Sequence, residues 1–320
     1  MSASRRCLVT GGAGFIGSHV VDQLVAEGHE VSVLDNLSTG KRENLPKNLD
    51  LYVYDILEDM TPVFRMVKPE VVFHLAAQVS VSVSVRDPRH DATQNVVGTI
   101  NLLEHCRRYG VPRVIYASSG AAYGEPDSLP LREEGSTLAV SPYGISKYVG
   151  ERYLYYYQQQ FGISFIALRF ANVYGPRQDP HGEAGVVSIF CERMLKGEEA
   201  VIFGDGRQTR DFVYVGDVAR ACVMAMDAPP VTDTFPAFNV STQKQTTVNT
   251  LFDLIAENAR STQSRIYAPE RPGDVRDSCL ANDKIRQYIG WKPEVDIKEG
   301  IRRTVEYFQK HMPQANAERQ

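Results

Sequence analysis

Short apolar runs alternate with longer amphipathic segments through the first half of the 320-residue chain. The apolar runs predict strands near Cys7, Val31, Leu51, Val71, Val114 and Phe165. The amphipathic segments predict helices near Gly17, Met60, Gly98 and Tyr148. Strands that alternate with helices in this way are typical of a parallel doubly wound sheet with helices on both faces. The predicted fold class is therefore α/β.

The pattern loosens after Asn172, where glycine and proline separate shorter elements. A helix from Val186 to Lys196 and a strand from Val201 to Phe203 are predicted in this part. Together with the C-terminal half of the chain, they predict a second, smaller lobe that is interleaved with the first.

A glycine-rich turn separates the first predicted strand from the first predicted helix. The strand Cys7-Leu-Val-Thr10 is followed by Gly11-Gly-Ala-Gly-Phe-Ile-Gly17 and by a helix from Ser18 to Ala26. Glycines in this pattern allow a tight turn and a close backbone approach to a pyrophosphate, whose charge the helix N-terminus attracts. The second strand, Glu30 to Leu34, ends at Asp35, whose carboxylate suits the ribose hydroxyls of NAD and repels a 2′-phosphate. The pattern predicts NAD binding.

Tyr143 and Lys147 stand four residues apart on a second predicted helix. Ser141 is a good N-cap, Pro142 suits the first helical position, and the helix is expected to reach Phe161. Residues i and i+4 lie on one helix face, so the phenol and the ammonium point to the same place. We expect the ammonium to lower the pKa of the phenol and to make it a base for an alcohol proton. The spacing alone also fits a solvated helix face, because the chain contains 16 tyrosines.

Composition disfavours several classes of protein. Contents of 43% hydrophobic and 23% charged residues are ordinary for a soluble globular chain, and no segment approaches the length of a membrane span. The five scattered cysteines and the histidines, among them a packed His74, show no disulfide or zinc pattern. A net charge of -4 does not indicate a nucleic-acid partner. We therefore expect a cytoplasmic protein with a small-molecule partner, no metal and no membrane contact.

Further motifs follow in order along nearly the whole chain. They are His74-Leu-Ala-Ala77, Ser118-Ser119 before Tyr123-Gly124, Leu168-Arg-Phe-Ala-Asn-Val-Tyr-Gly-Pro176, Arg210-Asp-Phe-Val-Tyr-Val-Gly-Asp217 and Arg271-Pro-Gly-Asp274. With the glycine turn and the Tyr143 to Lys147 spacing, the sequence resembles the extended short-chain dehydrogenase/reductase family. Within that family it is most similar to the NAD-dependent nucleotide-sugar epimerase/dehydratase group, in particular to 4-epimerases of the UDP-glucose (UDP-galactose) type.

The resemblance implies a Rossmann doubly wound domain over residues 1–171, to which 211–240 returns, and a nucleotide-sugar-binding lobe over 172–210 and 241–320. It implies that the residues at NAD are Gly11, Gly14, Phe15, Ile16, Gly17, Asp35, Asn36, Leu37, Ser38, Thr39, Gly40, Asp55, Ile56, Leu75, Ala76, Ala77, Tyr143, Lys147 and Phe170. The residues that match the family's substrate contacts are Gln78, Ser119, Tyr143, Asn172, Val201, Phe203, Arg210, Arg271 and Ser278. Without the resemblance, Leu75 to Ala77 are equally well explained as strand-end packing, and Arg210 as an ion-pair partner of Asp211.

Ser119 joins Tyr143 and Lys147 as the third expected catalytic residue, because it follows a strand at the edge of the sheet where doubly wound folds bind ligands. Family members that eliminate water carry an Asp-Glu pair directly after this hydroxyl residue, and those that decarboxylate to UDP-xylose carry a glutamate at the second position. This chain has Gly120-Ala121 there. The resemblance therefore implies C4 epimerisation of a UDP-sugar. Tyr143 removes the 4-hydroxyl proton as hydride moves to tightly bound NAD, the 4-keto sugar rotates, and the hydride returns to the other face.

The identity of the sugar is open at this stage. Ser278 falls at the family's gate beside the sugar C2 substituent, where a tyrosine would exclude N-acetyl groups, so both UDP-glucose and UDP-N-acetylglucosamine are expected substrates. UDP-glucuronate is an alternative, since Arg86, Arg177 and Arg276 could meet a carboxylate. A net NAD(P)-dependent nucleotide-sugar oxidoreductase is another, which Asp35 disfavours. The intact catalytic residues disfavour a third alternative, a non-catalytic nucleotide sensor.

The resemblance also implies a homodimer. In the family, the helices equivalent to Thr93 to Tyr109 and Pro142 to Phe161 form a four-helix bundle between two subunits. Tyr153 and Tyr155-Tyr156-Tyr157 suit such an interface, although aromatic residues on a long helix are as often core or rim.

Overall fold

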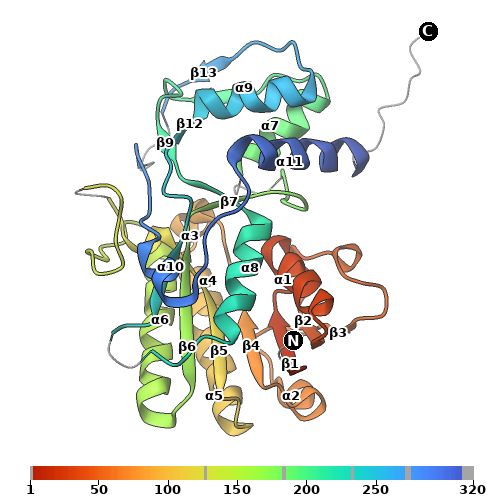
Figure 1. The fold of residues 1–320 in the computed structure, drawn as a ribbon, viewed down its shortest axis with the longest axis vertical. Coiled ribbons are helices and arrows are strands. Elements are labelled where there is room, and N and C mark those ends of the chain that lie inside the picture. The colour runs from red at the N-terminus through yellow and green to blue at the C-terminus, as the bar shows by residue number, and fades with distance from the viewer. Residues whose placement is uncertain (1–2, 126–127, 182–184, 232–233, 271–274, 312–320) are drawn as a thin grey trace.

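The larger part of the molecule is built on one parallel sheet of seven strands (Figure 1). The structure is a computed structural model that describes residues 3–125, 128–181, 185–231, 234–270 and 275–311. The strand order is β11-β6-β5-β4-β1-β2-β3, with every pairing parallel. The bounds are β1 (Arg6–Thr10), β2 (Glu30–Leu34), β3 (Asp50–Tyr52), β4 (Val71–His74), β5 (Arg113–Ser119), β6 (Ser164–Phe170) and β11 (Ala237–Val240). The order reverses between β1 and β4, and doubly wound sheets bind dinucleotides at this kind of point.

Helices cover both faces of the sheet. One face carries α1 (Phe15–Ala26) and α8 (Val215–Met226), which stand in front of the strands in Figure 1. The other face carries α2 (Thr61–Val67), α5 (Gly98–Arg108) and α6 (Pro142–Phe161). Because neither face meets water, the central strands are apolar along nearly their whole length, and every residue of β4 is buried. The predicted α/β Rossmann fold is confirmed.

A smaller lobe lies beyond the carboxyl ends of the strands (Figure 1). Its elements are β7 (Asn172–Tyr174), α7 (Val186–Leu195), β8 (Val201–Phe203), β9 (Thr209–Arg210), β10 (Phe212–Tyr214), β12 (Thr246–Thr247), α9 (Val248–Ala259), β13 (Ile266–Ala268) and α11 (Ile297–His311). Side chains of α7, α9 and α11 form its core, for example Phe190, Phe252 and Ile301. The two parts are interleaved, because β7 follows β6 directly whereas α8 and β11 return to the large sheet.

One predicted helix is interrupted in the structure. The segment expected to run from Thr93 to Tyr109 begins as a π-helical turn, η2 (Thr93–Val97), between α4 (Pro88–Ala92) and α5. Turns of this kind are frequent at functional sites, because the wider turn redirects one side chain. Here Asn95 is the buried residue of the turn.

The segment after the smaller lobe's strands also contacts the large domain. Helix α10 (Asp283–Ile289) packs beside β11, and both Ile285 and Trp291 belong to the core cluster that contains α1 and α8 side chains. Part of the chain after residue 240 therefore packs into the core of the large domain. The expected division at residues 171, 210 and 240 stays a prediction.

All five cysteines are free and buried. Within the described residues, no cluster of three or more His, Cys, Asp or Glu side chains could hold a metal ion. Among the helices that the structure describes, none has the length and apolarity that a membrane crossing requires.

Candidate active site

The glycine turn after β1 is closed too tightly for side chains. Gly11 has φ +68, and a Cβ there would lie 2.6 Å from the backbone nitrogen of Ala76. A Cβ on Gly17 would lie 2.1 Å from the carbonyl oxygen of Gly11. The turn therefore packs directly against the segment after β4, which holds Leu75, Ala76 and Ala77 as expected neighbours of the nicotinamide. The N-cap of α1, Gly14, contributes no side-chain hydrogen bond, and the first turn carries no acidic residue.

Asp35 lies at the end of β2 and faces this turn. Its Oδ2 accepts a hydrogen bond from the Ala13 N–H (2.9 Å) and its Oδ1 accepts one from the Leu37 N–H (2.8 Å). Burial raises the pKa of this carboxyl, while the two N–H donors lower it. The close contact extends to Gly40, where a Cβ would lie 2.8 Å from Asp35 Oδ1.

The neighbouring loop is ordered by its own polar contacts. Asn36 Nδ2 donates to Asp55 Oδ2 (2.8 Å), and the Ser38 N–H donates to Asn36 Oδ1 (3.0 Å). This contact places two expected adenosine-binding segments, 36–40 and 55–56, side by side. The side chain of Ile56 is buried and packs against Gly98.

These residues fit the dinucleotide that the sequence predicts. The close-packed glycines let the chain turn directly into α1, and the N-terminus of a helix suits a pyrophosphate. The Asp35 carboxylate is held beside the same turn, at the position that suits ribose hydroxyls. Phe15 and Ile16 begin α1, and Phe170 pairs with Ser119 across β5 and β6.

Helix α6 begins as predicted. Ser141 Oγ accepts a hydrogen bond from the Gly144 N–H (3.2 Å), and Pro142 occupies the first helical position. The side chains of Tyr143 and Lys147 both face the sheet: Tyr143 lies close enough to Ser119 for this hydroxyl to lower the pKa of the phenol, and Lys147 Nζ donates to the carbonyl of Ala117 (2.9 Å). All three expected catalytic residues therefore meet at the end of β5.

The expected effect of Lys147 on Tyr143 is corrected by this geometry. Burial raises the pKa of Tyr143 to about 12, and the hydrogen bond with Ser119 only partly opposes the shift. Burial also lowers the pKa of Lys147 to about 8, while the attraction of Asp91 acts in the other direction. The ammonium is directed to the Ala117 carbonyl and not to the phenol. In this arrangement, desolvation of the phenolate outweighs any attraction from the lysine.

Ser119 ends β5 and starts a short 3-10 turn. Its Oγ accepts a hydrogen bond from the Ala121 N–H (3.1 Å). The following Gly120 lies under Leu280, because a Cβ on this glycine would be 3.2 Å from Leu280 Cδ1. The segment that contains Ser278 therefore crosses the carboxyl end of β5, close to the catalytic residues.

Several of the expected substrate residues lie on segments near the catalytic residues. Ser278 donates its N–H to the carbonyl of Thr209 (3.1 Å), and the Arg210 guanidinium donates to the carbonyls of Thr209 and Arg276. Asn172 is exposed at the start of β7. Asp211, considered above as a partner of Arg210, accepts hydrogen bonds from Thr242 and Gln243.

Two further expected substrate residues, Val201 and Phe203, lie in the smaller lobe. Val201 and Phe203 begin and end β8, and Phe203 is partly exposed. A cavity of about 570 Å³ begins at the next residue, Gly204, and is lined also by Tyr267 and Glu270. Arg271 lies outside the described residues.

His74 is a packed histidine, as expected. Its Nδ1 lies 2.8 Å from Thr10 Oγ1 and its Nε2 lies 3.0 Å from Thr99 Oγ1. Burial lowers its pKa to about 3, so the ring is neutral.

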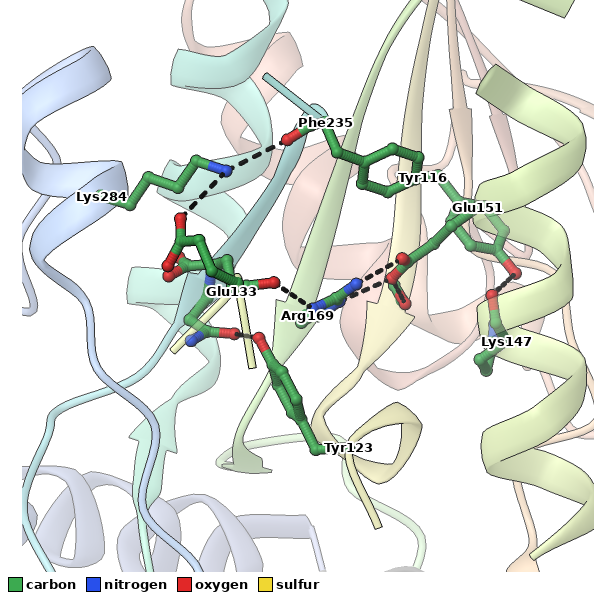
Figure 2. A network of polar contacts seen from close by, with 11 residues as sticks. Tyr116, Tyr123, Glu133, Lys147, Glu151, Arg169, Phe235 and Lys284 are labelled. Carbon is green, nitrogen blue, oxygen red and sulfur yellow. Dashed lines mark hydrogen bonds and ion pairs between the residues drawn. The ribbon is translucent and has the colours of Figure 1, made fainter. Parts of the chain in front are cut away.

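A buried ion pair that the sequence analysis did not identify supports the catalytic helix (Figure 2). Glu151 of α6 and Arg169 of β6 are 0% and 2% exposed, and Arg169 donates to both carboxylate oxygens of Glu151 (2.9 and 2.7 Å). Ser118 Oγ, next to Ser119, also donates to Glu151 (2.5 Å). A usable signal existed, since Tyr143, Lys147 and Glu151 follow one another at steps of four residues and so share a helix face.

The network continues towards the smaller lobe. Tyr123 OH donates to Asn239 Oδ1 (2.7 Å), and the Asn239 N–H donates to Glu133 Oε1 (2.8 Å). Leu131 in the same loop bonds through its backbone to Cys279 and Ala281 on either side of Leu280. Figure 2 shows the Tyr123 and Glu133 contacts on the side of Arg169 opposite Glu151. The catalytic strand and the Ser278 segment thus share one hydrogen-bonded framework.

The fold and the site define a dinucleotide-binding enzyme of the doubly wound α/β class. The sequence model described as the NAD dependent epimerase/dehydratase family matches residues 7–241. The chain belongs to this family.

Solved structures support the same assignment. UDP-glucose 4-epimerase from Thermotoga maritima, solved with UDP-glucose, is 50% identical with a TM-score of 0.91, over 95% of this chain and 98% of that chain. UDP-glucose 4-epimerase from Thermus thermophilus, solved with NAD, is 46% identical with a TM-score of 0.91, over 96% and 99%. UDP-N-acetylglucosamine 4-epimerase from Methanobrevibacter ruminantium, in complex with UDP-N-acetylmuramic acid, is 37% identical with a TM-score of 0.91, over 97% and 100%.

Proposed function

We propose that the protein is an NAD-dependent isomerase that inverts C4 of a UDP-sugar. The observation that carries the proposal is the meeting of Ser119, Tyr143 and Lys147 beside the glycine turn, with Gly120-Ala121 directly after Ser119. Such a site can remove and return an alcohol proton, whereas those two positions offer no side chain for elimination or decarboxylation. The structural similarity to UDP-glucose 4-epimerases supports the same reaction.

Two groups of residues hold the cofactor in this proposal. The glycine turn with Phe15 and Ile16 binds the pyrophosphate, and the Asp35 loop with the Asp55 segment binds the adenosine. Lys147 and Phe170 lie at the nicotinamide end. When bound there, NAD supplies a hydride acceptor at C4 and the hydride donor for the return step.

The protein's own residues manage one proton and one oxygen. Tyr143 takes the proton of the 4-hydroxyl, and Ser119 holds the C4 oxygen at the same time. Burial raises the pKa of Tyr143 to about 12, so the phenolate must be stabilised when the site is filled. Lys147 can do this if its ammonium turns from the Ala117 carbonyl to the phenol. The same proton is returned when the sugar is reduced from its other face.

Substrate recognition extends from the catalytic residues to the smaller lobe. In this proposal Gln78 faces the sugar, and Asn172, Arg210 and Arg271 bind the diphosphate. Val201 and Phe203 border the uracil. Arginine suits phosphate oxygens because its planar fork donates two parallel hydrogen bonds.

Ser278 controls the space at C2 of the sugar. Because serine is small, we expect both UDP-glucose and UDP-N-acetylglucosamine to be converted. Replacement of Ser278 by tyrosine should lower kcat/KM for the N-acetylated sugar by at least about tenfold through steric exclusion, with a smaller effect on UDP-glucose. Initial rates with both sugars test this, with Ser278→Ala as the small-residue control. A parent enzyme inactive on UDP-N-acetylglucosamine would contradict the assignment.

UDP-glucuronate receives less support. Arg177 pairs with Asp22, and Arg276 lies 3.5 Å from Asp205, so two of the three candidate partners for a sugar carboxylate already face acidic side chains.

The decisive experiment needs no added cofactor. Purified protein is incubated separately with UDP-glucose, UDP-N-acetylglucosamine and UDP-glucuronate, and the C4 epimers are resolved by chromatography. We expect each of the first two sugars to reach an equilibrium of epimers with no net change in NADH absorbance. Stoichiometric consumption of added NADH would indicate a net oxidoreductase instead, and no conversion of any sugar would reject the epimerase.

We also propose a homodimer built on α5 and α6. Tyr153, Tyr156 and Phe161 of α6 are 37%, 51% and 45% exposed, which is high for aromatic residues on one helix, and Val97 beside α5 is 52% exposed. Tyr157, by contrast, is buried and donates its hydroxyl to Glu104 of α5 (2.5 Å), so it joins the two helices within one subunit. Aromatic residues are enriched at protein interfaces.

A further inference from the structure

A buried carboxylate outside the expected site lies close to the catalytic helix. Asp91 of α4 is 1% exposed. Its Oδ1 accepts a hydrogen bond from Gln78 Nε2 (2.7 Å) and lies 3.1 Å from Asn95 Nδ2. Its Oδ2 has no hydrogen-bond partner among the residues that the structure describes. An ionised carboxylate in such a position is costly unless a cation compensates it.

Hydrogen bonds connect Asp91 to the turn of α6 that carries the catalytic pair. Asn95 Nδ2 lies 3.1 Å from Ser146 Oγ, and Ser146 Oγ donates to the carbonyl of Tyr143 (3.0 Å). Ser146 directly precedes Lys147. Asn95 also accepts the Gln78 N–H at its Oδ1 (2.8 Å), so the same group fixes the loop expected at the sugar.

A buried cation, Lys147, directly follows Ser146 on the same turn of α6 and can compensate this carboxylate. It is 4% exposed, and attraction by Asp91 raises its pKa against the effect of burial. Two other titratable groups nearby do not take this role: His74 of β4 is neutral, and Glu151 of α6 is paired with Arg169. The remaining titratable or charged groups on the packed elements are Tyr116 of β5, Tyr143 of α6, Asp87 of α4, and the exposed Arg86, Arg89 and His90.

We propose that Asp91 is a positioning residue of the active site, which holds Gln78 and Asn95 against the turn of α6 that carries Tyr143 and Lys147 and places a buried negative charge beside that turn. Asp91 acts through these residues and touches no reacting atom. The proposal rests on the proposed function, because the reaction that Asp91 influences is the proposed epimerisation. Its electrostatic part concerns the folded, NAD-containing protein and can be measured without turnover.

The test compares Asp91→Asn, which removes the charge at constant size, with Asp87→Asn. Asp87 is the exposed N-cap of the same helix, and asparagine caps equally well. Two readouts are recorded: the pH profile of kcat/KM with UDP-glucose, and the phenolate absorbance titration of Tyr143, obtained by subtracting Tyr143→Phe in each background. Loss of the negative charge makes the Lys147 ammonium less stable and the Tyr143 phenolate more stable. In Asp91→Asn both limbs of the profile and the Tyr143 titration should therefore move to lower pH by about one unit, and in Asp87→Asn they should not move.

An unmoved profile and titration in folded, NAD-containing Asp91→Asn would overturn the proposal. Should that variant lose NAD or unfold, Asp91→Glu carries the test, because it keeps the charge but displaces it. The parental pH profile with a reduced kcat is then expected, and a profile displaced to low pH would overturn the proposal. A parent without epimerase activity would reject the proposed function and leave the Tyr143 titration as the readout for Asp91.

Discussion

At the scale of single residues, the active site holds charges that burial disfavours. Lys147 lies with its ammonium 5.2 Å from the centre of the Tyr116 ring and bonded to one backbone carbonyl. Burial lowers the pKa of Lys147 to about 8 and raises the pKa of Tyr143 to about 12, which favours the neutral form of each side chain. Both groups are costly to hold in the charged forms that proton transfer from a sugar requires. Functional sites are where such costs are expected.

Replacement of Tyr143 by phenylalanine should lower kcat by at least about 100-fold, because it removes the hydroxyl that is proposed to take the proton. The fold and the bound NAD should be retained, since phenylalanine keeps the ring of Tyr143 and lacks only its hydroxyl. Turnover of UDP-glucose and NAD released on denaturation measure the two effects. Tyr153→Phe, on the exposed side of the same helix, is the matched control, and full activity of Tyr143→Phe would end the catalytic assignment.

The buried lysine should leave a mark on the pH dependence of stability. Its pKa is about 8 in the folded protein and 10.5 when unperturbed, so between these values the unfolded chain binds more protons and the parent becomes more stable as pH rises. Lys147→Met lacks this effect. Its free energy of unfolding relative to the parent should therefore be highest below pH 8 and fall by about 3 kcal/mol on going to pH 10.5. Urea unfolding of both NAD-free proteins tests this, and a pH-independent difference would contradict it.

At the scale of elements, the site depends on two junctions between a strand and a helix. The first is the β1 to α1 turn, which is closed against the segment after β4 at Gly11 and against itself at Gly17. The second is the contact between β5 and α6, which is fixed by the Glu151 and Arg169 pair and by Ser118. Removal of one partner from a buried ion pair typically costs about 3 to 5 kcal/mol, so α6 is held firmly in register with the sheet.

A methyl group at Gly17 should open the first junction. Its Cβ would lie 2.1 Å from the Gly11 carbonyl oxygen, which forces the turn apart, so Gly17→Ala should purify without NAD and with a lowered melting temperature. Gly28→Ala is the matched control in the same unit. Its Cβ meets no atom within 4 Å, and its φ of +84 should cost about 1 kcal/mol of stability without loss of NAD. Normal NAD content in Gly17→Ala would refute the role of the turn.

At the scale of the whole molecule, the carboxyl ends of the large sheet and the smaller lobe enclose the site. The loop at Leu131 and the 279–281 segment pair with each other, so the part that carries Ser278 is tied to the large domain and not only to the smaller lobe. In the proposed dimer, the second subunit would cover the exposed faces of α5 and α6.

Tyr156→Glu should weaken the proposed dimer by at least about 100-fold in Kd, because it places a charge in an interface that aromatic side chains form. Sedimentation velocity over a concentration series measures this. Met66→Glu on α2, where the side chain is 74% exposed, controls for an added charge elsewhere and should leave the dimer intact. A parent that sediments as a monomer at all concentrations would remove the proposal.

Local chemistry along the chain was enough to predict several features of the protein. Apolar runs of strand length, the Ser141 cap with Pro142, and the glycines of the first turn each act within a few residues, so the strands, the start of α6 and the dinucleotide fold could be predicted. Other features depend on contacts between distant segments and could be identified only in the tertiary structure. Asp91, Asn95, Glu151 and Arg169 come from four elements and became recognisable as parts of the site only when packing buried them together. The pKa of Tyr143 also depends on the tertiary structure. The surrounding fold desolvates the phenol and raises its pKa, and the spacing of Tyr143 and Lys147 in the sequence does not reveal this burial.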